Sequence, residues 1–174
     1  MSESVHKHRE SAPDRVGVAV LTISDTRTPE TDTGGDTVEE LMRGAGHEIV
    51  ERGIVRDEAS GIRTKLVELL ARSDVDAVIT TGGTGISARD TTYEVVDSML
   101  EKKLDGFGEI FRMLSYEEIG AAAILSRCVA GAVGTNFVAC LPGSRNAVRL
   151  AVEKLLVPEL AHLVFELRKH QKGR

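Results

Sequence analysis

Hydrophobic and polar positions form two kinds of segment along the chain. Strand-like runs with a continuous apolar or β-branched character lie at residues 16–24, 48–55 and 77–80. Between and after these runs, apolar side chains recur at helical spacing over residues 37–46, 58–72 and 93–102. Strands that alternate with helices in this way predict an α/β fold, a three-layer α/β/α sandwich with a mainly parallel sheet.

The second half of the chain departs from this alternation. Short apolar strands at residues 128–133 and 137–141 flank Gly134-Thr135-Asn136, which predicts an antiparallel hairpin added to the parallel sheet. The sequence Gly106-Phe107-Gly108-Glu109 indicates a break before helical stretches that reach about Leu125. The remainder is predicted to be helical, with Pro158 as a kink or a restart.

Composition and net charge indicate which kinds of partner and which compartment to expect. The chain has 174 residues and a formal net charge of −5, which argues against a general nucleic-acid or anionic-membrane surface. It has neither a signal-peptide pattern nor a run of 18 apolar residues, so we expect a cytoplasmic protein with no membrane segment. Residues 1–14 are expected to be a disordered polar tail, and residues 15–174 a single domain. Cys128 and Cys140 are expected to be buried, reduced thiols.

Residues 76–94 carry the strongest local signal. A short strand leads into Gly82-Gly83-Thr84-Gly85, here called the glycine loop, and a helix is expected to begin near Thr91. Backbone N–H groups at such a turn and at a helix N-terminus form an anion site. Asp90 lies beside it, and a carboxylate next to a phosphate site favours a bridging divalent metal. The spacing matches neither a Walker A motif nor a Rossmann fingerprint, and a tight connection that binds nothing is the alternative.

Other polar residues follow the remaining strands. Ser24 and Asp25 come after the first strand, Asp57 after the second, and Pro142-Gly143-Ser144 after the hairpin. The carboxyl ends of parallel strands share one edge of the sheet, where ligands of α/β domains bind. We therefore expect these residues, the glycine loop and Asp90 to form one site.

Several blocks, in order, resemble the MoaB/Mog family of molybdenum cofactor biosynthesis proteins. The blocks cover about residues 15–165 and are ISDTRTPETDTGG, TTGGTGISARDTTYE, GFGEIFRMLSYEEIG, LSR and LPGS; the third is similar to the MoaB branch. The resemblance implies a trimer or hexamer that adenylylates molybdopterin with ATP and Mg²⁺ and releases pyrophosphate. The predicted helix at residues 93–102 and the block at residues 107–124 carry more apolar residues than a single buried helix face needs, among them Phe107, Ile110, Phe111, Met113 and Leu114. This excess also predicts an interface between copies of the chain.

The resemblance also implies roles for individual residues. The glycine loop would cradle nucleotide phosphate, and Asp57 and Asp90 would act in catalysis by binding Mg²⁺ and positioning substrate. Ligand-binding positions extend to Ser24, Asp25, Glu94, Ser126, Arg127, Pro142, Gly143 and Ser144. Glu94 is a candidate for holding water or metal, and Arg127 is either a phosphate partner or part of a surface ion pair.

Two positions depart from the pattern of the family. Arg56 stands where the Mog branch has proline, and Gly34 where many relatives have serine. The competing interpretation is an oligomeric module that binds molybdopterin or a nucleotide without turnover. Because both Asp57 and Asp90 are present, we favour the enzyme.

Overall fold

The computed structural model describes residues 12–170, and most of the tail expected to be disordered (residues 1–11) lies outside this range. Within the described residues, six strands form one sheet in the order β2-β1-β3-β6-β5-β4. The strands are β1 Gly17–Ile23, β2 Glu48–Val55, β3 Ala77–Thr81, β4 Lys102–Lys103, β5 Val129–Val133 and β6 Asn136–Leu141. Strands β2, β1, β3 and β6 are parallel, whereas β5 pairs antiparallel with both β6 and β4. The mainly parallel sheet and the antiparallel hairpin are confirmed.

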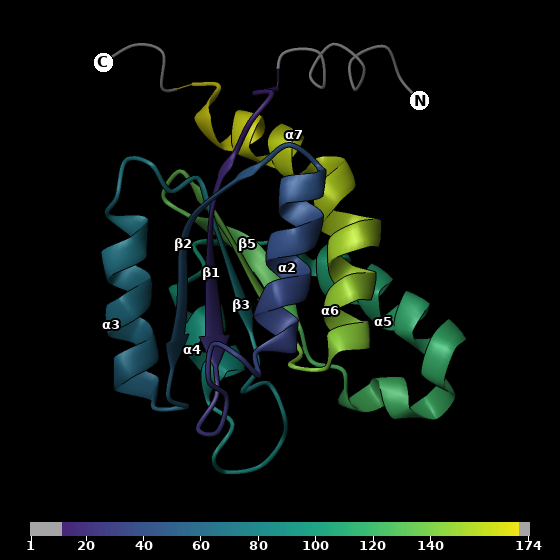
Figure 1. Cartoon of the computed structure of the whole chain (residues 1–174). Coiled ribbons are helices and arrows are strands. Elements are labelled where there is room, and N and C mark those ends of the chain that lie inside the picture. The colour runs from purple at the N-terminus through teal and green to yellow at the C-terminus, as the bar shows by residue number, and fades with distance from the viewer. Residues whose placement is uncertain (1–11, 171–174) are drawn as a thin grey trace.

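Helices cover both faces of the sheet (Figure 1). Their bounds are α2 Thr33–Gly44, α3 Ala59–Leu70, α4 Thr92–Met99, α5 Asp105–Ile119, α6 Arg145–Ala151 and α7 Val157–Arg168. A 3₁₀ segment, η1 (Gly120–Leu125), follows α5, and a π-helical segment, η2 (Val152–Leu156), joins α6 to α7. Pro158 lies in the first turn of α7, directly after η2, so the helix type changes at the predicted kink or restart.

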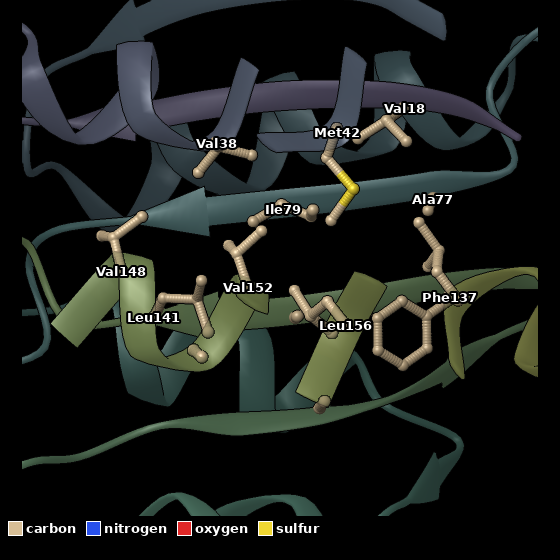
Figure 2. Packing of buried hydrophobic residues seen from close by; sticks show 14 of the residues in the cluster. Val18, Val38, Met42, Ala77, Ile79, Phe137, Leu141, Val148, Val152 and Leu156 are labelled. Atoms are coloured by element: carbon tan, nitrogen blue, oxygen red, sulfur yellow. The ribbon is translucent and has the colours of Figure 1, made fainter. Parts of the chain in front are cut away.

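Each face of the sheet has its own hydrophobic core. On one face, Val38 and Met42 of α2 pack over Ile79 of β3. Val152 and Leu156 of η2 belong to the same cluster (Figure 2). On the other face, Ile62, Leu66 and Leu69 of α3 pack with Val95 and Val96 of α4. Cys128 and Cys140 are buried free thiols, and burial raises the pKa of each to about 12. The three-layer arrangement follows from these two cores.

Three predicted boundaries are wrong, each for a local reason. Helix α2 begins at Thr33 rather than at residue 37, because the Asp32 carboxylate caps it by accepting from the Gly35 N–H at 3.0 Å. Gly106 and Gly108 lie within the first turn of α5 instead of breaking the chain, and Gly108 is buried close to the Cys128 carbonyl. Helix α4 ends at Met99 rather than at residue 102, and the next residues form edge strand β4 beside β5.

Both ends of the described chain lie at the amino edge of the sheet. Pro13 and Arg15, just before β1, line a groove of about 300 Å³ together with Val164, Phe165, Arg168 and Lys169 at the end of the last helix. Asp76, just before β3, accepts from the Gly17 N–H at 2.6 Å and pairs with Arg168. None of the helices within residues 12–170 has the length and apolar character needed to span a bilayer.

Candidate active site at the carboxyl edge of the sheet

The loops after β1, β3 and β6 meet in close backbone contact. Gly82 has φ +96°, and a Cβ there would lie less than 3.0 Å from the Ile23 carbonyl oxygen. A Cβ on Gly143 would lie 3.1 Å from the Gly82 Cα atom. A cavity of about 120 Å³ remains between these loops, lined by Thr22, Ile23, Ser24, Arg27, Asp32, Gly34, Thr81, Gly82 and Gly143. Backbone thus forms much of the wall, as expected of a phosphate cradle.

Asp32 lies beneath this cavity and was missed in the sequence. It is 1 % exposed, and besides capping α2 it accepts from the Thr22 hydroxyl at 2.8 Å and from Arg52 at 3.0 Å. These bonds fix the N-terminus of a twelve-residue helix beside Gly34 and Arg27. An aspartate directly before Thr33 is an ordinary helix-start signal, and it could have been found.

Asp57 joins the glycine loop to the start of α4. Its Oδ1 atom accepts from the Thr91 N–H at 3.1 Å and from the Thr91 hydroxyl at 2.7 Å. Its Oδ2 atom faces Gly83, where φ is +63° and an added Cβ would lie less than 3.0 Å from that oxygen. The Thr92 hydroxyl, on the same side of Gly83, is buried with no hydrogen-bond partner in the described part of the chain.

Asp90 lies against the other end of the glycine loop. Its Oδ2 atom accepts from the Ser87 hydroxyl at 2.6 Å and the Ser87 N–H at 3.0 Å, and a Cβ added to Gly85 would lie 2.6 Å from it. The pKa of Asp90 is lowered, chiefly by the Ser87 hydroxyl bond and further by backbone bonds and Arg127, so this carboxylate is ionised at neutral pH. Asp57 and Asp90 therefore contact the glycine loop at Gly83 and at Gly85.

Asp25 is brought to the same edge, as the sequence predicted. Its Oδ1 atom accepts from the Asp57 N–H at 3.3 Å, and its carboxylate pairs with Arg89. The Arg89 hydrogen bond is the main cause of the lowered pKa of Asp25. Arg89 was missed, because its partners lie 64 and 31 residues away in the chain.

Glu94 and Arg127 pair with each other. The Arg127 guanidinium also donates to the Gly85 carbonyl at 3.1 Å and lies 4.2 Å from the centroid of the Tyr93 ring. Of the two alternatives left open for Arg127, the structure contains the ion pair. Because the same side chain donates a hydrogen bond to the Gly85 carbonyl, it also holds the glycine loop in place.

Ser24, Ser144 and Pro142 accept hydrogen bonds from other groups of the chain. The Ser24 hydroxyl accepts from the N–H groups of Thr26 and Arg27, and the Ser144 hydroxyl caps α6 by accepting from the Ala147 N–H at 3.3 Å. The Pro142 carbonyl accepts from the Thr81 hydroxyl at 3.1 Å. Ser126 follows η1 as its C-terminal cap, away from these three loops in the sequence.

A metal ion at this edge would need ligands from its substrate. Within residues 12–170, no group of three or more His, Cys, Asp or Glu side chains could hold an ion alone. Asp57 and Asp90 supply two carboxylates beside the glycine loop. That set fits Mg²⁺, which keeps several waters and binds through one or two carboxylates together with substrate phosphates.

A wider cavity of about 660 Å³ opens beside the cradle and shares Ser24 and Arg27 with it. Arg52 and Arg56 also line it, together with the last residues of β2. Its wall carries charges of both signs, because Asp25 also lines it and Arg52 pairs with Asp32, Asp36 and Glu39.

The family follows from comparison with known proteins. Residues 19–162 match the model of the probable molybdopterin binding domain. The chain belongs to this family. Molybdenum cofactor biosynthesis protein B of Bacillus cereus is 47 % identical over 167 residues, covering 95 % of this chain and 99 % of the relative. The protein of the same name in Staphylococcus carnosus is 53 % identical over 154 residues, 87 % of this chain and 90 % of that one.

Solved structures of the family share the fold. A crystal structure of molybdenum cofactor biosynthesis protein B matches with a TM-score of 0.89 and 48 % identity, over 91 % of this chain and 99 % of that one. The tungsten cofactor synthesizing protein MoaB from Pyrococcus furiosus matches with a TM-score of 0.81 and 36 % identity, over 90 % and 99 %. The MoaB/Mog resemblance found in the sequence is confirmed.

Proposed function

We propose that this member of the molybdopterin-binding domain family adenylylates molybdopterin, with ATP as donor and Mg²⁺ as cofactor. The curated relatives are named for molybdenum cofactor biosynthesis, which supports a biosynthetic role of that kind. One observation carries the specific reaction. Two carboxylates, on Asp57 and Asp90, contact the same glycine loop at Gly83 and Gly85. A glycine loop flanked by two carboxylates suits a nucleotide bound with a divalent metal.

The proposed reaction is a displacement at phosphorus. An oxygen of the terminal phosphate of molybdopterin attacks the α-phosphorus of ATP and forms a new P–O bond. The bond from the α-phosphorus to the bridging oxygen breaks, and pyrophosphate leaves with the electron pair. The attacking phosphate is already an anion, so no side chain has to remove a proton. Catalysis of this kind consists mainly of positioning and charge neutralisation.

The residues of the site divide this work. Backbone N–H groups of the glycine loop after Gly82 would hold the nucleotide phosphates, because the Gly82 N–H already donates to the Leu141 carbonyl at 3.1 Å. Gly83 leaves room for the Asp57 carboxylate and the Thr92 hydroxyl, toward which a side chain would point. Asp57 and Asp90 would hold Mg²⁺, which when bound would neutralise charge on the α-phosphate and the leaving pyrophosphate. The cradle beside Gly34 and Gly143, with Arg27 on its wall, is the second anion site.

The competing function is an oligomeric module that binds molybdopterin or a nucleotide without turnover. It is favoured by the bonds from Asp57 to Thr91 and from Asp90 to Ser87, since carboxylates held within their own chain can serve structure alone. Turnover therefore has to be measured directly.

Purified protein, molybdopterin and Mg-ATP separate the two functions. We expect one equivalent of adenylyl-molybdopterin and one of pyrophosphate per site in a single turnover, and neither when the metal is chelated. Binding of molybdopterin without release of pyrophosphate would instead establish the module.

We also propose that the protein assembles as a homotrimer or homohexamer. Exposed apolar side chains extend along α5 and η1, from Ile110 (46 % exposed) to Ile124 (80 %). They also include Met113, Tyr116, Ile119 and Leu125. Phe111, which the interface prediction included, is fully buried in the core and cannot contribute, whereas Phe107 and Leu114 are only partly buried.

Ile124→Asp is expected to reduce the assembly to the monomer, because it would bury an unpaired charge in the interface. Val67→Asp is the matched control, since Val67 is also exposed, at 55 %, but lies on α3 across the sheet. Light scattering measures the mass of each variant. A wild-type mass near 18.8 kDa at micromolar concentration would contradict the assembly.

A further inference from the structure

Arg89 closes a ring of hydrogen bonds around Asp90. Its Nε and Nη2 atoms donate to the two oxygens of Asp25 at 2.9 and 3.1 Å. Asp25 in turn accepts from the Asp57 N–H, and Asp57 accepts from the N–H and hydroxyl of Thr91. Asp90 is the residue between Arg89 and Thr91, so its chain is held on both sides.

The ring joins three parts of the carboxyl edge. Asp25 follows β1, Asp57 follows β2, and residues 89–91 lead from the glycine loop into α4. Arg89 adds a further bond from Nη1 to Glu58, next to Asp57, at 2.9 Å. Two sets of bonds therefore tie the segment that carries Asp90 to its surroundings: those from Thr91 to Asp57, and those from the Arg89 guanidinium to Asp25 and Glu58.

We propose that Arg89 is a positioning residue that sets where the Asp90 carboxylate lies relative to Asp57. Its side chain is 57 % exposed, and exposed ion pairs add little to folding stability. A guanidinium can nevertheless bind a carboxylate with two parallel bonds and a second carboxylate with a third, and a lysine ammonium cannot reproduce that fork. The effect on turnover rests on the proposed function, whereas the effect on the ring does not.

Arg72 provides a matched control within the chain. It bonds Asp74 through Nε and Nη2 at 2.9 and 2.7 Å, and Glu51 through Nη1 at 2.6 Å. The bonding pattern is that of Arg89, but Arg72 lies just before β3, at the amino edge of the sheet. If Arg89 contributed only to folding stability, substitutions at Arg89 and at Arg72 should have the same effect on residues 86–91.

Hydrogen exchange measured by mass spectrometry tests the ring in the full-length protein. Arg89→Lys keeps the charge and Arg89→Gln removes it, and we expect both to speed amide exchange in residues 86–91 about tenfold. Arg72→Gln should leave that segment unchanged. Exchange at the wild-type rate in both Arg89 variants, or equal acceleration in Arg72→Gln, would overturn the proposal.

Turnover provides the second measurement. We expect Arg89→Lys to lower kcat about tenfold with a smaller change in KM, because a shift of about 1 Å in a catalytic group is enough for such losses. A wild-type kcat in Arg89→Lys would overturn the positioning role and leave only charge. If the wild-type protein transfers no adenylyl group, the proposed function fails, while the exchange measurement still decides whether Arg89 orders the segment.

Discussion

Replacing Asp90 with asparagine is expected to slow adenylyl transfer about a hundredfold, which corresponds to roughly 3 kcal/mol of lost transition-state stabilisation. Asparagine keeps the shape of the side chain and an oxygen that can accept from Ser87, but it removes the charge that would hold Mg²⁺. Asp57→Asn should behave similarly. The double variant should lose less than the product of the two effects, because both carboxylates would serve one metal site.

Single-turnover formation of adenylyl-molybdopterin measures these losses. Asp97→Asn is the control, because Asp97 also lies on α4 but pairs with Lys103 outside the site. Molybdopterin binding should change little in any of these variants, since neither carboxylate attracts an anion without metal. A wild-type rate in Asp90→Asn would remove its catalytic role and favour the binding module.

Gly83→Ala is expected to weaken Mg-ATP binding about tenfold or more. The new Cβ would meet both the Asp57 carboxylate and the Thr92 hydroxyl at less than 3.0 Å, so Asp57 or the loop has to move. Gly134→Ala separates this effect from backbone strain. Gly134 has φ +57°, close to the value at Gly83, but no atom lies within 4 Å of its added Cβ.

Calorimetry of ATP binding, with and without Mg²⁺, compares the two variants. Both should lose about 1 kcal/mol or more of folding stability through the positive φ, but only Gly83→Ala should lose affinity for the nucleotide. Equal affinity in the two variants, or binding that is indifferent to Mg²⁺, would show that the glycine loop is not the phosphate site.

The parts predicted from the sequence are those set by burial and topology. Strands β1 and β3 are buried along their whole length, so their apolar, β-branched runs were unambiguous. Parallel strands place their carboxyl ends together, so the meeting of Asp25, Asp57 and Asp90 followed from the parallel arrangement of the strands that precede them. These predictions needed no knowledge of which side chains bond to one another.

Apart from the Asp32 cap, which is a local signal, the parts that were missed depend on contacts between distant residues. The glycine-rich start of α2 has low helix propensity, and it is helical because Asp32 caps it and Arg52 holds Asp32 from β2. The fork of Arg89 on Asp25 and Glu58 has no local pattern at all. Gly106 and Gly108 are tolerated in α5 because this helix packs against β5, and that too is a tertiary effect.

Pro13 and Lys169 line the same groove, so a label or tether joined near either described end lies on the same side of the protein. Both described ends lie at the amino edge of the sheet, across the full length of the strands from the loops that follow β3 and β6 (Figure 1). A tag, a fluorophore or a surface tether joined near either end would leave the ligand loops facing solution. Immobilised binding measurements are therefore compatible with this fold in either orientation of attachment.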